Sequence, residues 1–289
     1  MKFKKYLIGM LSIIIMLLAI GCTSSNESSE NNKGEAVIAT SVAVTEILDA
    51  IGVKVDGIPT TSYELPESTK GAVEVGSPMN PDLEIIKSLN PKVVVSVDTL
   101  GQDFMDSFVE NNIPSEFINL TSLQGLKNSI YKLGETFDKQ DNAKKVLEEI
   151  NNKESELSTK FEDKEKPKIL TIFGAPGSMM LATDKSYVGN IVKLAGGENI
   201  IESYKLPFMA VNKEEIAKLN PDKILVMVHA EIEKTKKMVE QNLETDAAWK
   251  SLDAVKNGNV HYLDSTYFGM SANLKVIEAM DMMNDIIYN

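Results

Sequence analysis

The sequence predicts an α/β protein of two similar lobes joined by one long, mostly helical segment. In two stretches of the 289-residue chain, short apolar runs that suit strands alternate with segments of helical spacing. Such alternation is typical of parallel sheets whose strands are connected by helices. Between these stretches strand-like sequence ceases, and the chain is long enough to form both lobes.

The first lobe is expected over residues 35–122. A helix is predicted to start near Val42, and a second helix over 81–89 should end at Asn90-Pro91, because proline cannot continue a helix. Val93 to Val97 is a run of mostly β-branched residues, which indicates a strand buried on both faces. Further strands are predicted at 35–39, 54–58 and 113–120.

Residues 123–162 are predicted to form the linking helix, and residues 163–289 the second lobe. Leu126, Ile130 and Leu133 recur at helical spacing, although Asp138 to Asp141 can interrupt the helix. In the second lobe, strands are predicted at 168–173, 224–228 and 260–263.

One pattern of the first lobe recurs in the second at an offset of 130 residues. Glu84 corresponds to Glu214, and Leu-Asn-Pro at 89–91 corresponds to the same three residues at 219–221, each time before an apolar strand. An ancient duplication and a common supersecondary constraint both explain the match. In either case the two lobes contain equivalent elements.

The composition excludes several classes of protein. The formal net charge is −12, all 30 basic residues are lysine, and the chain has two histidines and one cysteine. An acidic chain without arginine lacks the basic surface and the guanidinium fork that bind phosphates and bases, which argues against nucleic-acid binding. One cysteine cannot form a disulfide within the chain, and two histidines are too few for a histidine-rich metal cage.

The N-terminal residues predict export and lipidation. Three lysines precede an apolar run from Tyr6 to Ile20 that is short for a transmembrane helix but suits a signal peptide, predicted over residues 1–21. The small residues before Cys22 resemble a bacterial lipobox, whose cysteine receives a lipid such as palmitate. Residues 22–34 are rich in Ser, Asn and Glu, as in a flexible tether. The protein is therefore expected at the extracellular face of the bacterial cytoplasmic membrane, anchored by its lipid.

The two histidines have different predicted positions. In an open α/β sheet the ligand lies beyond the carboxyl ends of the strands. His229 is the first residue after the predicted strand 224–228, so it is a candidate ligand-binding residue. His261 lies inside the predicted strand 260–263 and is expected to be an ordinary strand residue.

The order and spacing of several motifs resemble a known family. They are the lipobox and tether, Pro81-Asp82-Leu83-Glu84, the two Leu-Asn-Pro segments, the linking helix, and Ala-Gly-Gly-Glu-Asn-Ile at 195–200. Together they resemble the helical-backbone (class III) substrate-binding lipoproteins of ABC importers for iron compounds and cobalamin. Within that family the chain is similar to the haem receptor lipoproteins of iron-regulated surface determinant systems.

That resemblance implies two Rossmann-like lobes joined by a single long helix, with the ligand in the cleft between them. It also implies haem (iron protoporphyrin) as the ligand, with its iron held by Met79 from one lobe and His229 from the other. A thioether and an imidazole are a known axial pair for haem iron. Pro78 and Pro81 restrict the backbone around Met79.

Other residues compete for these roles, since most of the 14 methionines must fill the core. Met209 lies 130 residues after Met79 and could line the pocket or replace it as ligand. Met179 and Met180 are further pocket candidates. Tyr63 and Tyr267 could supply a phenolate, although wall packing or a hydrogen bond is the expected role of both.

Haem propionates need polar partners, and this chain has no arginine to supply them. The backbone N–H groups of Val42 and Ala43, at the start of the first predicted helix, together with Tyr63, are the candidates for this role. Ser41 is expected at the N-cap of that helix and can be a cap alone.

Glu84 and Glu214 form a separate predicted site. Each lies near the first turn of a predicted helix, where the helix dipole favours a carboxylate. The resemblance implies that the two glutamates, one per lobe, engage basic residues of the two permease subunits.

The function expected from these observations is a monomeric haem receptor that delivers haem to an ABC permease and its ATPase for iron acquisition, with a cell-surface haem donor upstream. A siderophore or cobalamin receptor is the alternative, although siderophore receptors often use arginines. An enzyme is not expected, because no phosphate loop, dinucleotide fingerprint or nucleophile elbow is present. A Met/His pair would also fill both axial positions of the iron.

Overall fold

The computed structural model describes residues 34–161, 165–203 and 205–288. The predicted signal peptide, Cys22 and nearly all of the predicted tether lie outside the described residues. Among the described helices, none has the length and apolar character needed to span a bilayer.

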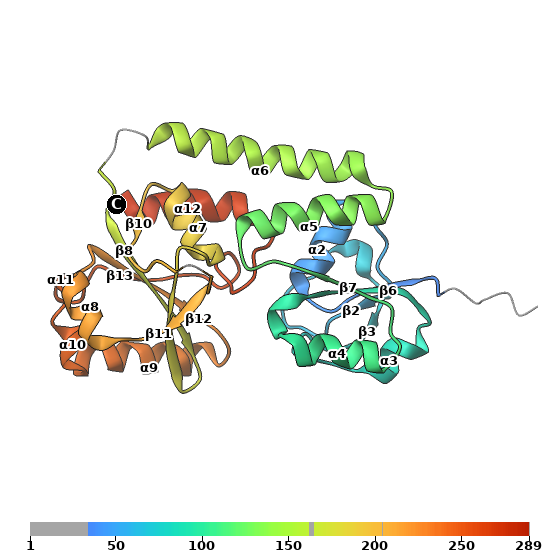
Figure 1. Ribbon diagram of the computed structural model, residues 1–289, viewed down its shortest axis with the longest axis horizontal. Helices are drawn as coiled ribbons and strands as arrows, with labels where there is room; N and C mark the ends of the chain where they lie inside the picture. Colours follow the sequence, from blue (N-terminus) through green and yellow to red (C-terminus); the bar gives the residue numbers. More distant parts are fainter. Residues whose placement is uncertain (1–33, 162–164, 204, 289) are drawn as a thin grey trace, which may run out of the picture. The chain divides into compact units, whose positions relative to one another are not determined.

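The first lobe is built on a parallel five-stranded sheet in the order β3-β2-β1-β6-β7 (Figure 1). Its strands are β1 (Ala36–Ala39), β2 (Gly57–Ile58), β3 (Val73–Glu74), β6 (Pro91–Val97) and β7 (Ser115–Ile118), with helices α2 (Val42–Ala50), α3 (Leu83–Ser88) and α4 (Gln102–Glu110). Residues of α2 join one apolar core, and residues of α3 and α4 join another. The sheet is thus covered on both faces, as the β-branched sequence of β6 predicted.

The second lobe has a mixed sheet in the order β11-β9-β8-β12-β13, with β10 also paired to β8. The strands are β8 (Lys168–Ala175), β9 (Ser178–Ala182), β10 (Glu198–Asn199), β11 (Phe208–Ala210), β12 (Lys223–Val228) and β13 (Val260–Tyr262). The helices are α7 (Tyr187–Leu194), α8 (Lys213–Leu219), α9 (Ile232–Thr245), α10 (Ala247–Lys250), α11 (Asp253–Lys256) and α12 (Val276–Tyr288). Strands β8, β12 and β13 are parallel, whereas β9 is antiparallel to β8 and to β11.

The 130-residue repeat of the sequence has a structural counterpart. Helices α3 and α8 start after the N-caps Asp82 and Asn212, which are 130 residues apart, and each cap side chain accepts a hydrogen bond from the glutamate two residues later. Each helix is followed by an asparagine with positive φ: Asn90, at 48°, comes directly after the C-cap of α3, and Asn220, at 38°, is the C-cap of α8. Asparagine tolerates this left-handed conformation, and the following proline starts the chain toward the next strand.

The predicted linking segment contains two helices, α5 (Leu123–Thr136) and α6 (Gln140–Lys160). The break lies at Asp138, whose φ is 55°, within the residues where the sequence allowed an interruption. A single helix over 123–162 is therefore wrong in this detail. Only α6, which is about 30 Å long at 1.5 Å per residue, runs along both lobes (Figure 1).

Contacts at the two ends of α6 explain how it connects the lobes. Near its start, the Asn142 side-chain amide donates to the Ile51 carbonyl of the first lobe at 2.9 Å. Farther along, Lys153 pairs with Asp281 of α12 at 2.6 Å. Just after its end, the ring of Phe161 stacks on Tyr288 with centroids 5.0 Å apart. One apolar cluster includes residues of α2, α5, α6, α7 and α12, so the core is continuous between the lobes.

Candidate functional site

Three neighbouring strands of the first lobe lead into the predicted ligand residues at their carboxyl ends. The chain passes from β1 into the start of α2 at Val42 and Ala43, from β2 into the loop that contains Tyr63, and from β3 into a hairpin that contains Met79. Because β3, β2 and β1 are adjacent and parallel, all four residues lie at one edge of the sheet. The sequence predicted the individual residues, and the strand order explains why they share an edge.

Met79 lies in the turn of a short hairpin made by β4 (Gly76–Ser77) and β5 (Asn80–Pro81). Its side chain is 69% exposed, which is unusual for a large apolar residue. Gly76 has a φ of 93°, and a Cβ there would lie 2.8 Å from the Asp82 amide nitrogen, so only glycine fits. The tight turn holds the thioether in front of α3 and open to a ligand.

His229 follows β12 directly and lies at the carboxyl edge of the second sheet. Its amide donates to the Gly174 carbonyl of β8 at 2.9 Å, and its imidazole is exposed. The Phe173 ring lies beside it, with centroids 6.2 Å apart, and Phe208 packs on Phe173 at 5.1 Å. The imidazole thus lies at the rim of a packed aromatic pair, of which Phe173 is buried and Phe208 partly exposed.

The carboxyl edges of the two lobes approach each other at Tyr63. The Tyr63 hydroxyl lies 3.3 Å from the Ser265 hydroxyl, which belongs to the loop after β13. A second contact between the lobes is the hydrogen bond that the Ala272 amide donates to the Leu120 carbonyl at 2.7 Å. Ser265 was not predicted as a site residue, and its sequence context is that of any polar loop serine.

The start of α2 has backbone donors available for an anion. Ser41 is the N-cap, and its hydroxyl accepts from the Val44 amide at 3.4 Å. The amides of Val42 and Ala43 precede the first intrahelical hydrogen bonds and have no acceptor within the described residues. A carboxylate placed here would satisfy these groups and meet the positive end of the helix dipole.

The competing candidates occupy different positions. Met209 lies inside β11, is 38% exposed and pairs with Leu181, so it is not the structural equivalent of the hairpin residue Met79. Met179 and Met180 lie in β9, both partly buried, and pack against different apolar cores. The Tyr267 ring is partly buried, and its carbonyl accepts from the Tyr187 hydroxyl at 3.2 Å.

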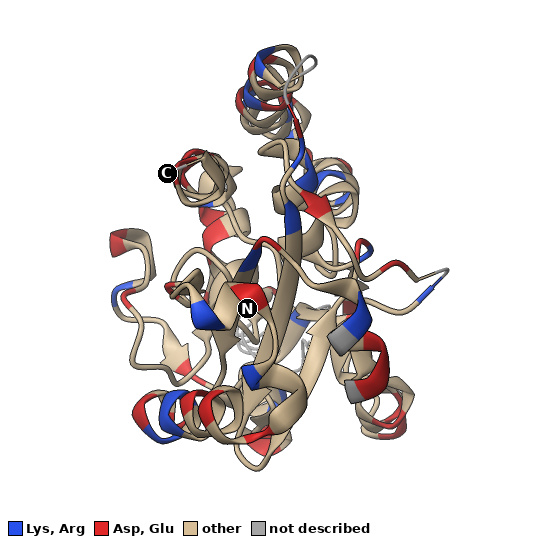
Figure 2. Ribbon diagram, turned by 90° about the vertical axis from the view of Figure 1, so that its left-hand side faces the viewer, with Lys and Arg blue, Asp and Glu red and all other residues tan. Residues whose placement is uncertain are grey.

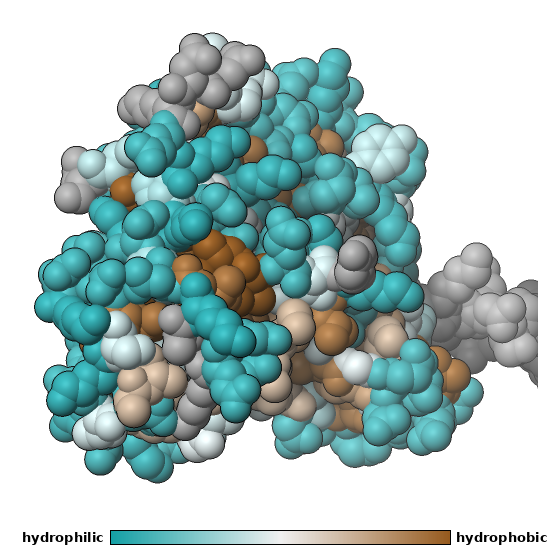
Figure 3. All heavy atoms as spheres, turned by 60° about the vertical axis from the view of Figure 1, so that its left-hand side comes forward, coloured by the Kyte–Doolittle hydropathy of each residue, from teal (hydrophilic) through white to brown (hydrophobic). Residues whose placement is uncertain are grey.

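Glu84 and Glu214 are the second residues of α3 and α8, and both are exposed. Glu84 pairs with Lys87 on the next turn at 2.7 Å. Exposed pairs of this spacing contribute little to stability, so this contact leaves the carboxylate open to exchange with a partner. More generally, acidic and lysine residues are interspersed along the helices (Figure 2), and the face in Figure 3 is largely hydrophilic with recessed apolar side chains.

His261 lies in β13, as predicted. It pairs in register with Leu225, and its Nε2 atom is buried without a hydrogen-bond partner among the described residues. Burial lowers the pKa of the imidazole, and the nearby charge of Lys223 lowers the pKa further. The residue is the middle one of three in this edge strand and belongs to its packing.

This lowered pKa predicts a pH-dependent stability. Below about pH 6.5 the unfolded chain protonates His261 first, whereas folded His261 stays neutral, so the free energy of unfolding should fall as the pH decreases toward the folded pKa. Above that range the contribution is fully present. Denaturant unfolding from pH 8 to pH 5 should show a smaller loss in His261→Gln than in wild type, and equal losses would contradict this assignment.

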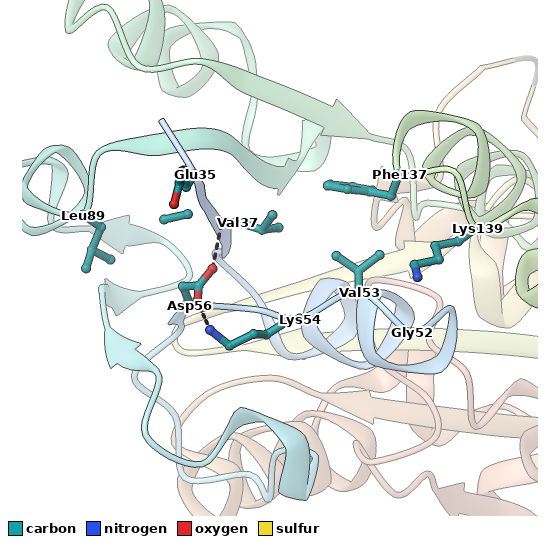
Figure 4. A pocket seen from close by; sticks show the side chains of 10 residues that line it. Glu35, Val37, Gly52, Val53, Lys54, Asp56, Leu89, Phe137 and Lys139 are labelled. Atoms are coloured by element: carbon teal, nitrogen blue, oxygen red, sulfur yellow. Dashed lines mark hydrogen bonds and ion pairs between the residues drawn. The ribbon is translucent and has the colours of Figure 1, made fainter. Parts of the chain in front are cut away.

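A separate cavity of about 770 Å³ lies at the opposite edge of the first sheet (Figure 4). It is lined at the amino ends of β1 and β2, by residues that include Glu35, Val53 and Asp56, with Phe137 and Lys139 from the break before α6. Asp56 pairs with Lys54 there at 2.5 Å. None of the predicted ligand residues lines this cavity.

Two α/β lobes joined by a long helix, with exposed ligand-type side chains at both carboxyl edges, define a substrate-binding protein. The family model of periplasmic binding proteins matches residues 37–267, and the chain belongs to this family. The chain is therefore a binding component of transport rather than an enzyme, and the predicted fold class and family are confirmed.

Individual relatives are similar along their whole length. The high-affinity heme uptake system protein IsdE of Staphylococcus aureus is 34% identical over 289 residues, which cover all of this chain and 99% of the relative. The structure of S. aureus IsdE complexed with heme matches with a TM-score of 0.84 at 35% identity, over 88% of this chain and 99% of that chain. An ABC transporter substrate-binding protein from Listeria monocytogenes also matches at 0.84, with 38% identity over 89% of this chain and 99% of that chain.

Proposed function

We propose that this protein is a receptor lipoprotein that binds haem and delivers it to an ABC permease for iron acquisition. The observation that carries the proposal is the exposed imidazole of His229, held at a carboxyl edge beside Phe173, in a chain that is similar over its full length to a heme uptake protein. Haem is the cargo of this protein, and no reaction on it is needed.

Met79 and His229 are the proposed iron ligands, one from each lobe. The donor set fits ferric or ferrous haem, because a thioether and an imidazole can occupy the two axial positions. Both side chains are exposed at carboxyl edges, where they are accessible to a bound ligand. Phe208, partly exposed and packed on the buried Phe173, supplies apolar surface for the porphyrin. Met209, 38% exposed on the edge strand β11, is proposed to line the same pocket.

The amides of Val42 and Ala43 and the hydroxyl of Tyr63 are the proposed partners of the haem propionates. Uncharged donors at a helix start can hold a carboxylate in a chain that has no arginine. Tyr63 is 49% exposed and reaches Ser265 of the other lobe, so a propionate bound there would contact both sides of the cleft.

The remaining parts of the proposal concern the membrane and the partners. We propose that a signal peptide over residues 1–21 is removed, that lipid on Cys22 holds the protein at the extracellular face of the cytoplasmic membrane, and that the residues up to 34 act as a tether. The receptor acts as a monomer that takes haem from a cell-surface donor and docks on the permease and its ATPase through Glu84 and Glu214.

A spectroscopic titration of the purified protein tests the ligand. Haemin should give a low-spin Soret band that shifts on reduction, whereas cobalamin and a ferric siderophore should not compete for binding. Haem dimethyl ester, which lacks both carboxylates, should bind more weakly than haem. Saturable binding of cobalamin or the siderophore without a haem spectrum would overturn the proposal.

A further inference from the structure

The backbone immediately after His229 has an unusual conformation. Ala230 and Glu231 both have positive φ, 55° and 42°. Residues with a Cβ rarely adopt this left-handed region. Asparagine and aspartate do so more often than other residues, so an alanine followed by a glutamate is an unusual pair there. Such conformations persist where surrounding contacts hold them, and they gather at functional sites. The contacts that hold this segment are therefore of interest.

One buried residue, Thr235 on the first turn of α9, contacts both of them. It is 1% exposed. Its hydroxyl donates to the Ala230 carbonyl at 2.9 Å, and its amide donates to the Glu231 carbonyl at 2.9 Å. The bond to Glu231 is the ordinary first hydrogen bond of the helix, whereas the bond to Ala230 needs the threonine hydroxyl.

Thr235 also packs against β8, the strand next to the one that His229 follows. Its methyl carbon would lie 3.2 Å from a Cβ added to Gly174, so the two residues are close neighbours. The Gly174 carbonyl is the acceptor for the His229 amide. Thr235 therefore contacts the segment that follows His229 and also the part of β8 to which the His229 amide is hydrogen-bonded.

A second threonine of the same helix shows what a purely local role looks like. The Thr245 hydroxyl donates at 2.7 Å to the Gln241 carbonyl, four residues earlier and within α9. This bond returns to the helix itself and is common for threonine. The Thr235 bond instead reaches five residues back, to a carbonyl that lies outside the helix.

We propose that Thr235 is a positioning residue for the His229 imidazole. By holding the Ala230 carbonyl, its hydroxyl fixes the left-handed turn at 230 and 231, which sets the direction of the backbone at His229 and so the orientation of the ring beside Phe173. This inference rests on the proposed function, because it concerns how the proposed ligand His229 is presented to haem iron. A ligand fixed before binding loses less conformational freedom when the iron is bound.

The test uses Thr235→Val, which removes the hydroxyl and keeps the shape, Thr235→Ser, which keeps the hydroxyl, and Thr245→Val as the matched control. With only two histidines in the chain, the imidazole NMR signals of the haem-free protein can be assigned to His229 and His261. In Thr235→Val the His229 signals should broaden or double while those of His261 stay unchanged. Thr235→Ser and Thr245→Val should keep the wild-type spectrum.

The rate of haem dissociation provides the second readout. It is measured by the transfer of haem to excess apomyoglobin. Loss of one hydrogen bond of ordinary strength should speed dissociation about tenfold in Thr235→Val, and Thr235→Ser should restore the wild-type rate. Ala230→Gly is a variant that avoids any folding problem, because glycine adopts positive φ without strain. It should melt no lower than wild type and still release haem faster.

The outcomes separate this inference from the proposed function. If Thr235→Val keeps the His229 signals and the wild-type dissociation rate, while His229→Ala loses the low-spin spectrum, the positioning role is wrong and the ligand assignment stands. If His229→Ala keeps the low-spin spectrum, the ligand assignment is wrong. In that case the NMR comparison of the haem-free variants still decides whether Thr235 orients the ring.

Discussion

Met79→Ala and His229→Ala are each expected to abolish the low-spin haem spectrum and to weaken haem binding strongly. Removing a direct iron ligand should cost more than the ~10- to 100-fold in metal affinity that follows loss of a ligand's hydrogen-bond partner. Both side chains are exposed, so neither substitution leaves a cavity in the core. The unfolding midpoint of the haem-free protein should therefore stay close to that of wild type.

Two control variants share the chemistry of the substitutions. Met282 is a methionine of α12 with 36% of its side chain exposed, and His261 is the second histidine. Met282→Ala and His261→Gln should keep the wild-type Soret band and affinity. If Met79→Ala also kept them, Met209 or a tyrosine would be the better candidate for the second iron ligand. If both proposed variants kept them, the ligand pair would be wrong.

The double variant Glu84→Ala with Glu214→Ala should keep haem binding and lose uptake. The two carboxylates are exposed at the same position of equivalent helices, one per lobe, which suits a partner made of two similar subunits. Complementary charges steer encounter and fix register, and removing both should lower uptake on the order of tenfold or more. Each single variant should lose less than the double variant.

Uptake by cells that depend on haem as their iron source measures this effect, with haem titration of the purified variant as the control for binding. Glu215→Ala removes an exposed carboxylate from the same first turn of α8 and should leave uptake unchanged. Full uptake by the double variant would contradict the docking assignment. A haem affinity that fell together with uptake would point to a binding defect.

Sequence periodicity predicted the parallel strands β1, β2, β6, β7, β8, β12 and β13, most of which are short runs of buried β-branched or aliphatic residues. The parallel strands β3 and β10, of two residues each, were not predicted. The sequence also predicted the equivalent helices, since Asp82 and Asn212 cap them and Asn90 and Asn220 follow them. The antiparallel strands β9 and β11 were not predicted. Strand β11 has three residues, and β9 follows a tight turn at Gly177 whose sequence also suits a loop.

The candidate site was predictable where a residue directly follows a strong strand signal, as His229 follows β12. Residues that support the site through contacts made only in the folded protein carried no such signal. Thr235 reads as an ordinary position of an amphipathic helix, and Ser265 as a polar loop residue. The Ser265 contact joins residues 202 positions apart in the sequence, and the Thr235 contact depends on the positive φ of Ala230 and Glu231, which no sequence pattern indicates.

The apolar cluster that runs from α2 through α5 and α6 to α12 has a thermodynamic consequence. Neither half of the molecule can lose its packing without exposing part of the other half's interior to water. The two lobes should therefore behave as one cooperative unit. The ligand-binding residues of the two lobes then become ordered or disordered together. Partial unfolding therefore does not leave one half of the binding site intact.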